Sequence, residues 1–193
     1  MNLSPLKADT IRKRGKYKPS YILAGYFSDR TYRPMVTLRL CQATRSWKQP
    51  ARLLHLFFRY LHKCACNRAG IDLPWKTKIG AGFSITHGWG MVVNGNASIG
   101  RNVTFFNGVT LGQRDRIARD GSRTTDYPVI EDEVWVGPLS IIVGGVTIGK
   151  GARIAGGSFV TENIPPYSIA SGNPAIVVKS GATPDVKNPA PYI

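Results

Sequence analysis

The chain has 193 residues, a length that fits one compact domain with a short appendage. Hydrophobic residues make up 42% and charged residues only 19%, which excludes a chain that is disordered throughout. The net charge of +15 is unevenly distributed: residues 1–70 hold 15 Lys and Arg against 2 acidic residues, whereas residues 71–193 hold 11 against 9. The basic character therefore belongs to the N-terminal third.

The cysteines and the apolar runs predict a cellular compartment. Cys41, Cys64 and Cys66 are an odd number with no disulfide framework, which is typical of a reducing environment. No apolar run reaches the ~18–20 residues that a membrane span requires, and the apolar stretch 21–27 is too short and too late for a signal peptide. We therefore expect a cytoplasmic protein.

Residues 1–70 are predicted to be a basic, partly helical region. Residues 1–20 carry Pro and Gly and favour an irregular segment, while 51–66 have the periodicity of an amphipathic helix. Two interpretations of that helix remain open: its apolar face covers the open end of a repeat domain or packs in a trimer, or the basic amphipathic segment contacts an anionic membrane surface. No nucleic-acid-binding motif accompanies the charge, so no nucleic-acid partner is expected. The apolar face contains Leu53, Leu54, Phe57, Phe58 and Leu61, and the polar face Arg52, His55, Arg59, His62 and Lys63.

A six-residue repeat runs through residues 71–178. Apolar anchors recur at steps of six, often followed by Gly or Ala, a period that fits neither a helix nor simple strand alternation. It fits a mainly β fold, a parallel β-helix of hexapeptide units in which each anchor points into the coil. The anchors are Leu73, Ile79, Ile85, Val93, Ile99, Phe105, Leu111, Ile130, Val136, Ile142, Ile148, Ile154 and Val160.

The repeat breaks twice. The step from Ile85 to Val93 is eight residues, and the polar segment 113–127 separates Leu111 from Ile130. Because a narrow coil has no room for such a segment, it is predicted to protrude as a loop, and such loops often build a binding face. The last residues, 179–193, are a polar tail with no visible role.

His87 is the one histidine within the repeat, and it lies in the first break. Asp72 precedes it by fifteen residues, which places the two on adjacent turns of a coil of about eighteen residues per turn. A carboxylate there fixes the imidazole tautomer and leaves the other ring nitrogen free to take a proton. The pattern predicts a general base, His87, oriented by Asp72.

The block DLPWKTKIGAGFSITHGWGMVVN, together with VTLG, GGVTIGKGARIAGGSFVTENIPP and GNPA, resembles the serine O-acetyltransferase branch of the hexapeptide-repeat acyltransferases. The resemblance implies a left-handed coil, a homotrimer with sites between subunits, and acetyl-CoA as co-substrate without a metal. It also implies that Asp72 and His87 form the catalytic pair, and that the backbone around Gly112 and Gln113 stabilises the oxyanion. The positions it implies for coenzyme binding are Gly137, Pro138, Ala155 and Gly156. Arg153 and Lys179 are candidate partners of the nucleotide phosphates because of their charge, and a solvated face is the open alternative for both.

The acceptor is predicted from a position at which this chain differs from the serine enzymes of that branch. Serine enzymes of that branch carry Arg-His before the proline that reopens the repeat, where this chain has Asp126 and Tyr127. Since Asp cannot pair a carboxylate as Arg does, we expect a sugar hydroxyl of a polysaccharide precursor, in the style of colanic-acid and capsular O-acetyltransferases. A serine O-acetyltransferase is the alternative. Candidate acceptor contacts are Asn107, Arg114, Tyr127 and Trp135. A structural role is the favoured interpretation of Trp135, and a solvated loop is an equal alternative for Arg114.

Three other classes of protein fit the sequence less well. A β-helical zinc carbonic anhydrase needs three histidine ligands, and the repeat holds only His87. Sugar-nucleotide pyrophosphorylases carry a nucleotide-binding domain before a similar coil, and the first 70 residues leave no room for such a domain. A purely structural β-helix would have an unbroken repeat. All three cysteines lie outside the repeat, so a cysteine nucleophile is not expected.

Overall fold

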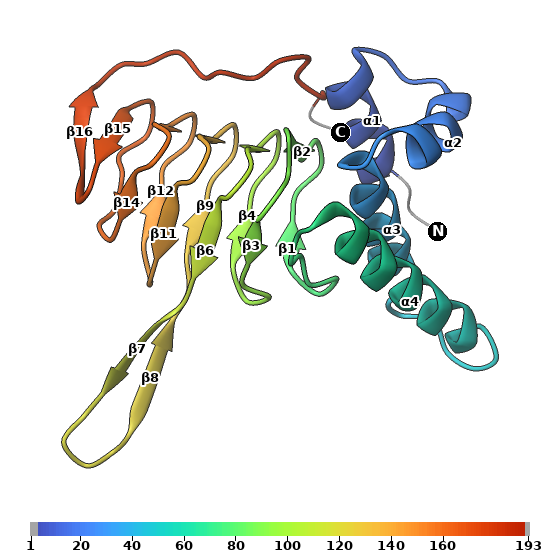
Figure 1. Ribbon diagram of the computed structural model, residues 1–193, viewed down its shortest axis with the longest axis horizontal. Coiled ribbons are helices and arrows are strands. Elements are labelled where there is room, and N and C mark those ends of the chain that lie inside the picture. The colour runs from blue at the N-terminus through green and yellow to red at the C-terminus, as the bar shows by residue number, and fades with distance from the viewer. Residues whose placement is uncertain (1–3, 192–193) are drawn as a thin grey trace.

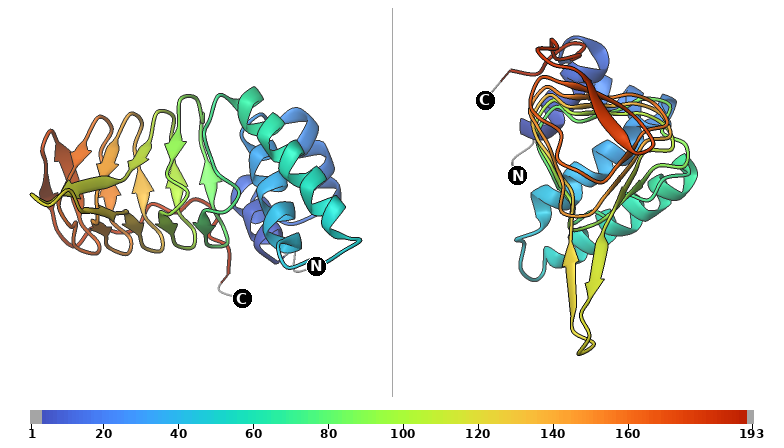
Figure 2. Two further views of the ribbon diagram at one scale, coloured as in Figure 1. Left: turned by 90° about the horizontal axis from the view of Figure 1, so that it is seen from below. Right: turned by 90° about the vertical axis from the view of Figure 1, so that its left-hand side faces the viewer.

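The structure, a computed structural model, describes residues 4–191 and consists of a helical end and a prism of β-strand coils (Figure 1). Four helices come first: α1 Ser4–Arg14, α2 Pro19–Ser28, α3 Tyr32–Thr44 and α4 Arg52–Ala69. Gly70 ends α4 in the left-handed conformation, which glycine adopts without strain. The chain then enters the prism, whose axis runs away from the helices (Figure 2).

Three parallel sheets form the faces of the prism. The chain visits them in a fixed rotation, and each sheet has its strands stacked along the axis. The first sheet contains β1 Lys78–Ile79, β4 Ser98–Ile99, β9 Val129–Ile130 and β12 Thr147–Ile148. The second contains β2 Ser84–Ile85, β5 Thr104–Phe105, β10 Trp135–Val136, β13 Arg153–Ile154, β15 Ile169–Gly172 and the antiparallel β16 Ala175–Lys179. The third contains β3 Val92–Val93, β6 Thr110–Gly112, β11 Ile141–Val143 and β14 Phe159–Val160.

The strand registers confirm the six-residue repeat. Thr147 pairs with Val129 eighteen residues earlier, which is three hexapeptides per turn. Every predicted anchor from Leu73 to Val160 is at most 9% exposed, so the anchors fill the prism interior. Ser98 pairs with Lys78 twenty residues earlier, because the first break inserts two residues into that turn.

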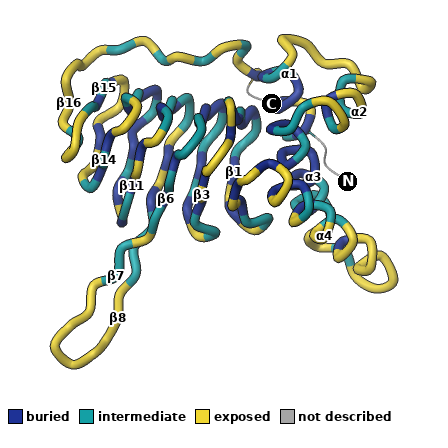
Figure 3. Tube along the Cα trace, in the orientation of Figure 1, coloured by how far each residue is buried: buried dark blue, intermediate teal, exposed yellow. Residues whose placement is uncertain are grey.

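The second break is a β-hairpin. Strands β7 Arg114–Ile117 and β8 Arg123–Asp126 pair antiparallel and project from the coil between β6 and β9. Most of the hairpin is exposed (Figure 3). Polar and charged side chains along both strands explain why it leaves the apolar interior of the prism.

The C-terminal tail returns along the prism to the helical end (Figure 1). The guanidinium of Arg12 on α1 binds the carbonyl of Lys187, and the amide of Asn102 donates to Ala190 O at 3.0 Å. The tail therefore joins the last coils to the first helix and covers part of the second sheet, a role that its polar sequence did not indicate.

The helical end differs from expectation in two ways. Residues 4–14, expected to be irregular, form α1, and its Asp9 and Arg12 are buried against the first coil. Helix α4 turns its large apolar residues to solvent: Leu53 is 66% exposed and Phe57 52%. The interpretation that this apolar face covers the end of the prism is therefore wrong.

Specific hydrogen bonds explain the orientation of α4. His55 and His62 face inward, with His55 Nδ1 3.0 Å from Thr44 Oγ1 and His62 Nδ1 2.9 Å from Thr37 Oγ1. His62 Nε2 also donates to Leu73 O at 2.7 Å. These bonds satisfy buried polar groups that would otherwise be costly to desolvate, so the histidine side of α4 packs on α3 and the prism.

Acidification is expected to destabilise the fold through His62. Burial lowers the pKa of His62, although the hydrogen bond to Leu73 opposes that shift. The unfolded chain therefore binds the proton first, and stability falls as pH drops below about 6.5, by up to ~1.4 kcal/mol per pH unit. Urea unfolding at pH 7.5 and 5.5 measures this, and His62→Gln should show the shallower dependence on pH. If the free energy of unfolding falls equally in both proteins between pH 7.5 and pH 5.5, the dependence on pH does not come from His62.

Candidate active site

His87 lies at the prism edge between the second and third sheets, here called the His87 edge. Ile85, Phe105, Val136 and Ile154 pair in register on the second sheet. Two residues beyond each of them the chain turns this edge, at His87, Asn107, Pro138 and Gly156. Leu139 N donates to Asn107 O and Gly157 N to Pro138 O, both at 2.8 Å, so these turns stack as a column parallel to the axis.

The two inserted residues push His87 out of the prism. Its φ is 62°, a left-handed conformation that is unusual for a residue with a side chain. The ring is exposed and lies 6.3 Å from that of Phe106 on the next turn. Backbone strain concentrates at functional sites, where surrounding contacts must hold it in place.

Arg30 supplies those contacts from the connection between α2 and α3. Its Nη2 donates to His87 O and its Nη1 to Ala69 O, both at 2.6 Å, and the guanidinium lies 3.7 Å from the ring centroid of Trp89. Asp29 holds the same connection through the backbone N–H groups of Thr31 and Tyr32 and an ion pair with Lys13 of 3.2 Å. Partial burial alone would raise the pKa of Asp29, but these partners together lower it.

Arg30→Gln is expected to reduce the acetyl transfer predicted from the sequence by about tenfold to 10²-fold, because small displacements of a catalytic group are costly. The loss should fall on kcat more than on the KM for acetyl-CoA, with an unchanged melting temperature. Arg33→Gln is the matched control, since Arg33 binds Tyr26 O and Phe27 O beside the same connection and does not contact His87. Equal losses in both variants would contradict a positioning role for Arg30.

Asp72 lies on the outer face of the third sheet. Strand pairing places its segment beside the residues that follow the His87 turn, but Asp72 is not bonded to His87. It forms a parallel bridge with Val92, and Gly90 N donates to Gly70 O at 2.8 Å, so segments 70–72 and 90–92 run side by side. Within the described residues, no hydrogen bond joins the side chains of Asp72 and His87. The pairing of the two groups remains a prediction.

A second group of predicted residues lies at another edge, between the third and first sheets, here called the hairpin edge. Gly112 ends β6, and Gln113 accepts a hydrogen bond from Asn94 at 3.1 Å. Arg114 starts the hairpin, and Tyr127 follows it. Within this chain the third sheet separates this edge from His87, so the predicted oxyanion donors and the predicted base do not meet.

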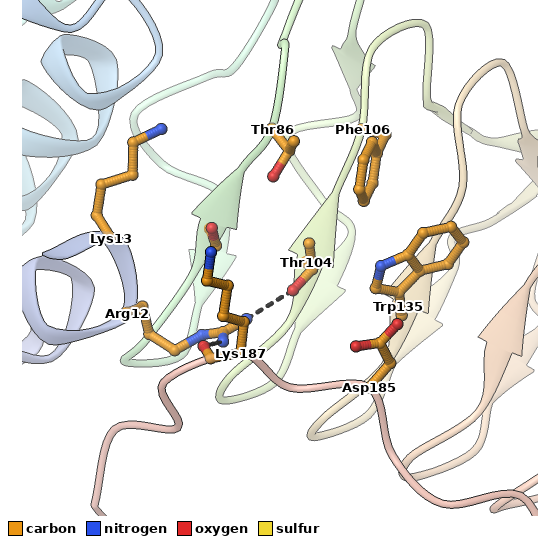
Figure 4. A pocket seen from close by; sticks show the side chains of 9 residues that line it. Arg12, Lys13, Thr86, Thr104, Phe106, Trp135, Asp185 and Lys187 are labelled. Atoms are coloured by element: carbon orange, nitrogen blue, oxygen red, sulfur yellow. Dashed lines mark hydrogen bonds between the residues drawn. The ribbon is translucent and has the colours of Figure 1, made fainter. Parts of the chain in front are cut away.

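A cavity of about 480 Å³ lies on the second sheet beside the His87 edge (Figure 4). Lys13 approaches it from the helical side and Trp135 from the opposite side, with Thr86 and Phe106 between them. The rings of Phe106 and Trp135 are 4.8 Å apart. Arg12 and Lys187 also line the cavity and outnumber its one carboxylate, Asp185. This excess of positive charge beside two flat rings suits a phosphate-bearing, partly aromatic ligand.

Two predicted coenzyme contacts, Arg153 and Lys179, lie outside the turns of the His87 edge. Arg153 lies on β13 and forms an ion pair with Asp185 of the tail, while its guanidinium also lies 5.4 Å from the Trp135 ring. A carboxylate therefore already neutralises it. Lys179 ends β16, on an exposed strand at the far end of the prism from His87.

In residues 4–191 no three His, Cys, Asp or Glu side chains group as metal ligands. Cys41 and Cys66 are buried, and burial raises the pKa of each to about 12, which keeps them as neutral thiols.

Arg30, Thr86 and Phe106 are the residues near His87 that sequence reasoning missed. Of these, only Thr86 and Phe106 had a signal, since each adjoins a residue already singled out.

A prism of hexapeptide coils with polar groups gathered at its edges defines a hexapeptide-repeat protein. Comparison with known proteins agrees: residues 127–162 match the model of the bacterial transferase hexapeptide family (six repeats). Soybean serine acetyltransferase, solved as the apoenzyme, superimposes with a TM-score of 0.70 at 30% identity, over 91% of this chain and 67% of that one. The chain belongs to the hexapeptide transferases, and its fold is their left-handed parallel β-helix with an N-terminal helical segment.

Two further similarities describe the relatives. Serine acetyltransferase 4 of Arabidopsis thaliana is 35% identical over 157 residues, which are 81% of this chain and 39% of that protein. Serine acetyltransferase of Brucella abortus, solved in complex with coenzyme A, has the same fold at a TM-score of 0.70 and 22% identity. The chain spans only 39% to 58% of the length of the curated relatives it matches.

The predicted sugar acceptor and the likeness to colanic-acid and capsular enzymes are wrong, because the relatives found by sequence and by structure are named serine acetyltransferases. The prediction of a sugar acceptor considered only the negative charge of Asp126. In the structure Asp126 forms an ion pair of 3.1 Å with Arg116 across the hairpin, so it is neutralised. Arg114 adds a further cation at the same edge.

Proposed function

We propose that this chain transfers the acetyl group of acetyl-CoA to the hydroxyl of serine, with His87 as the general base. The column of His87, Asn107, Pro138 and Gly156 along one edge carries the proposal. It combines an exposed imidazole with small residues, beside which an extended pantetheine arm can lie. The names of the relatives support serine as the acceptor.

The chemistry follows from the imidazole. Acetyl-CoA supplies a thioester, and no acyl-enzyme is needed. His87 takes the proton of the serine hydroxyl as its oxygen attacks the thioester carbonyl. It then returns the proton to the sulfur that leaves as CoA, which balances the reaction. Asp72 is proposed to orient the ring and stabilise the imidazolium.

Two further groups are assigned as part of the same proposal. Arg114 is the candidate partner of the serine carboxylate, since its Nε is buried and has no hydrogen-bond partner within the described residues. The backbone N–H groups at Gly112 and Gln113 are the candidate oxyanion donors. A homotrimer is proposed to bring the hairpin edge of one protomer against the His87 edge of the next, which unites these groups with the base.

The remaining positions are assigned to the two ligands. Gly137, Pro138, Ala155 and Gly156 are proposed to line the path of the coenzyme, and the cavity with Lys13 and Trp135 to take its nucleotide end. Pro138 lacks an N–H, so its contact is limited to packing. Asn107 and Tyr127 are proposed to contact serine.

The experiment is a thiol-release assay with acetyl-CoA and L-serine, run beside D-serine, L-threonine and a set of hexoses. Rapid release of CoA with L-serine, and mass-spectrometric detection of O-acetylserine, are the expected results. Release with a hexose and none with L-serine would refute the proposed acceptor. Absence of release with every hydroxyl compound would refute the proposed reaction.

A further inference from the structure

Helix α4 presents an apolar face to solvent on the side opposite its buried histidines. Leu53, Leu56, Phe57 and Tyr60 are 66%, 44%, 52% and 65% exposed. They lie at spacings of three, four and seven residues and so form one stripe along the helix. Contiguous exposed apolar surface of this kind marks an interaction site.

A basic cleft adjoins this stripe. It has a volume of about 660 Å³ and lies between the α3–α4 connection and the start of α4. Its cations are Arg45, Lys48, Arg52 and Arg59, and the rings of Trp47 and Trp75 complete its walls. Leu56 lines the cleft and belongs to the stripe, so the two features are continuous.

Asp72 lines a neighbouring cavity together with Arg59, but cations far outnumber carboxylates in the surrounding chain. Between Asp29 and Asp72 the sequence holds nine Lys and Arg and no Asp or Glu. Two copies of such a face would repel each other, which disfavours self-association through it. A nucleic acid would satisfy the cations but would leave four large apolar side chains without a partner. The combination of both features fits the interface of an anionic bilayer, where cations meet phosphates and apolar side chains enter the acyl boundary.

We propose that α4 is a docking helix for membranes that contain anionic phospholipid, with lipid phosphates in the basic cleft and the Leu53–Tyr60 stripe inserted below them. Binding is to the membrane surface, since within residues 4–191 no helix is long and apolar enough to cross a bilayer. Helix α4 and the α3–α4 connection form the outer corner of the helical end, away from the hairpin (Figures 1 and 3). The proposal does not depend on the acetyl acceptor.

The test is co-sedimentation of the full chain with vesicles of phosphatidylcholine alone or with about 30 mol% phosphatidylglycerol, which gives the vesicle surface a negative potential. Binding is expected only with phosphatidylglycerol. Leu53→Ser/Phe57→Ser and Arg52→Gln/Arg59→Gln should each lower the partition coefficient about tenfold or more, since apolar burial and charge both contribute. The matched controls are Ile176→Ser/Val178→Ser on β16, which are 65% and 58% exposed, and Arg119→Gln in the hairpin loop.

Several outcomes would overturn the proposal. Equal binding to both vesicle types would show that the cations are not involved, and unchanged binding of the double serine variant would exclude insertion. If Leu53→Ser/Phe57→Ser instead changes the mass measured by light scattering and leaves vesicle binding unaltered, the stripe is a subunit interface. Binding to a DNA duplex without binding to vesicles would assign the cations to a nucleic acid.

Discussion

Replacing His87 with asparagine is expected to lower kcat/KM for acetyl transfer by about 10²–10⁴-fold, the usual contribution of a general base. The substitution should leave the fold intact. Asparagine tolerates a positive φ such as the 62° of His87, and Arg30 binds the backbone carbonyl of this residue rather than its ring. Steady-state kinetics with saturating serine measures the loss.

Tyr167→Asn is the matched control for a residue replaced at a positive φ. Tyr167 has φ of 51°, is exposed, and lies in the turn before β15, away from the His87 edge. Its replacement should leave kcat/KM within about twofold of the wild-type value, since surface substitutions seldom matter. A His87→Asn enzyme with similarly full activity would exclude His87 as the base and move the search to the hairpin edge.

The prism could be predicted because its information is local. Each coil needs an apolar residue every sixth position, so the sequence from Leu73 to Val160 carries the register directly, and the structure buries every predicted anchor. The first break predicted that the chain departs from the coil at His87, and the two-residue insertion in the strand register confirms that departure. The parallel stacking follows from the same repeat.

The helical end could not be predicted because its contacts are long-range. The sequence of α4 shows which residues share a face, but not which face is buried. That depends on Thr37, Thr44 and the Leu73 carbonyl, which bind the two inward histidines. The contact of Arg30 with His87 likewise joins residues 57 positions apart, and no periodicity indicates it.

One buried ion pair attaches the helices to the prism. Asp9 of α1 and Arg39 of α3 are 1% and 2% exposed, and Arg39 Nε lies 2.7 Å from Asp9 Oδ2. Asp9 Oδ1 also accepts the backbone N–H groups of Gly82 and Phe83, at 2.9 and 3.0 Å. Arg39 in turn donates to Ile79 O at 2.7 Å and Gly80 O at 2.6 Å. The ion pair therefore supplies hydrogen-bond partners for backbone groups at the open end of the first coil, with one side chain from each helix.

Asp9→Asn is expected to lower the free energy of unfolding by about 3–5 kcal/mol, because it leaves the Arg39 charge buried without its partner. Urea unfolding followed by circular dichroism measures the change. Asp185→Asn breaks the ion pair with Arg153, whose side chains are 45% and 37% exposed, and should cost no more than about 1 kcal/mol. Asp9→Leu/Arg39→Met removes both charges and should recover stability relative to Asp9→Asn. If the double variant is instead as unstable as Asp9→Asn, the backbone hydrogen bonds of the pair, rather than its charges, hold the helices on the prism.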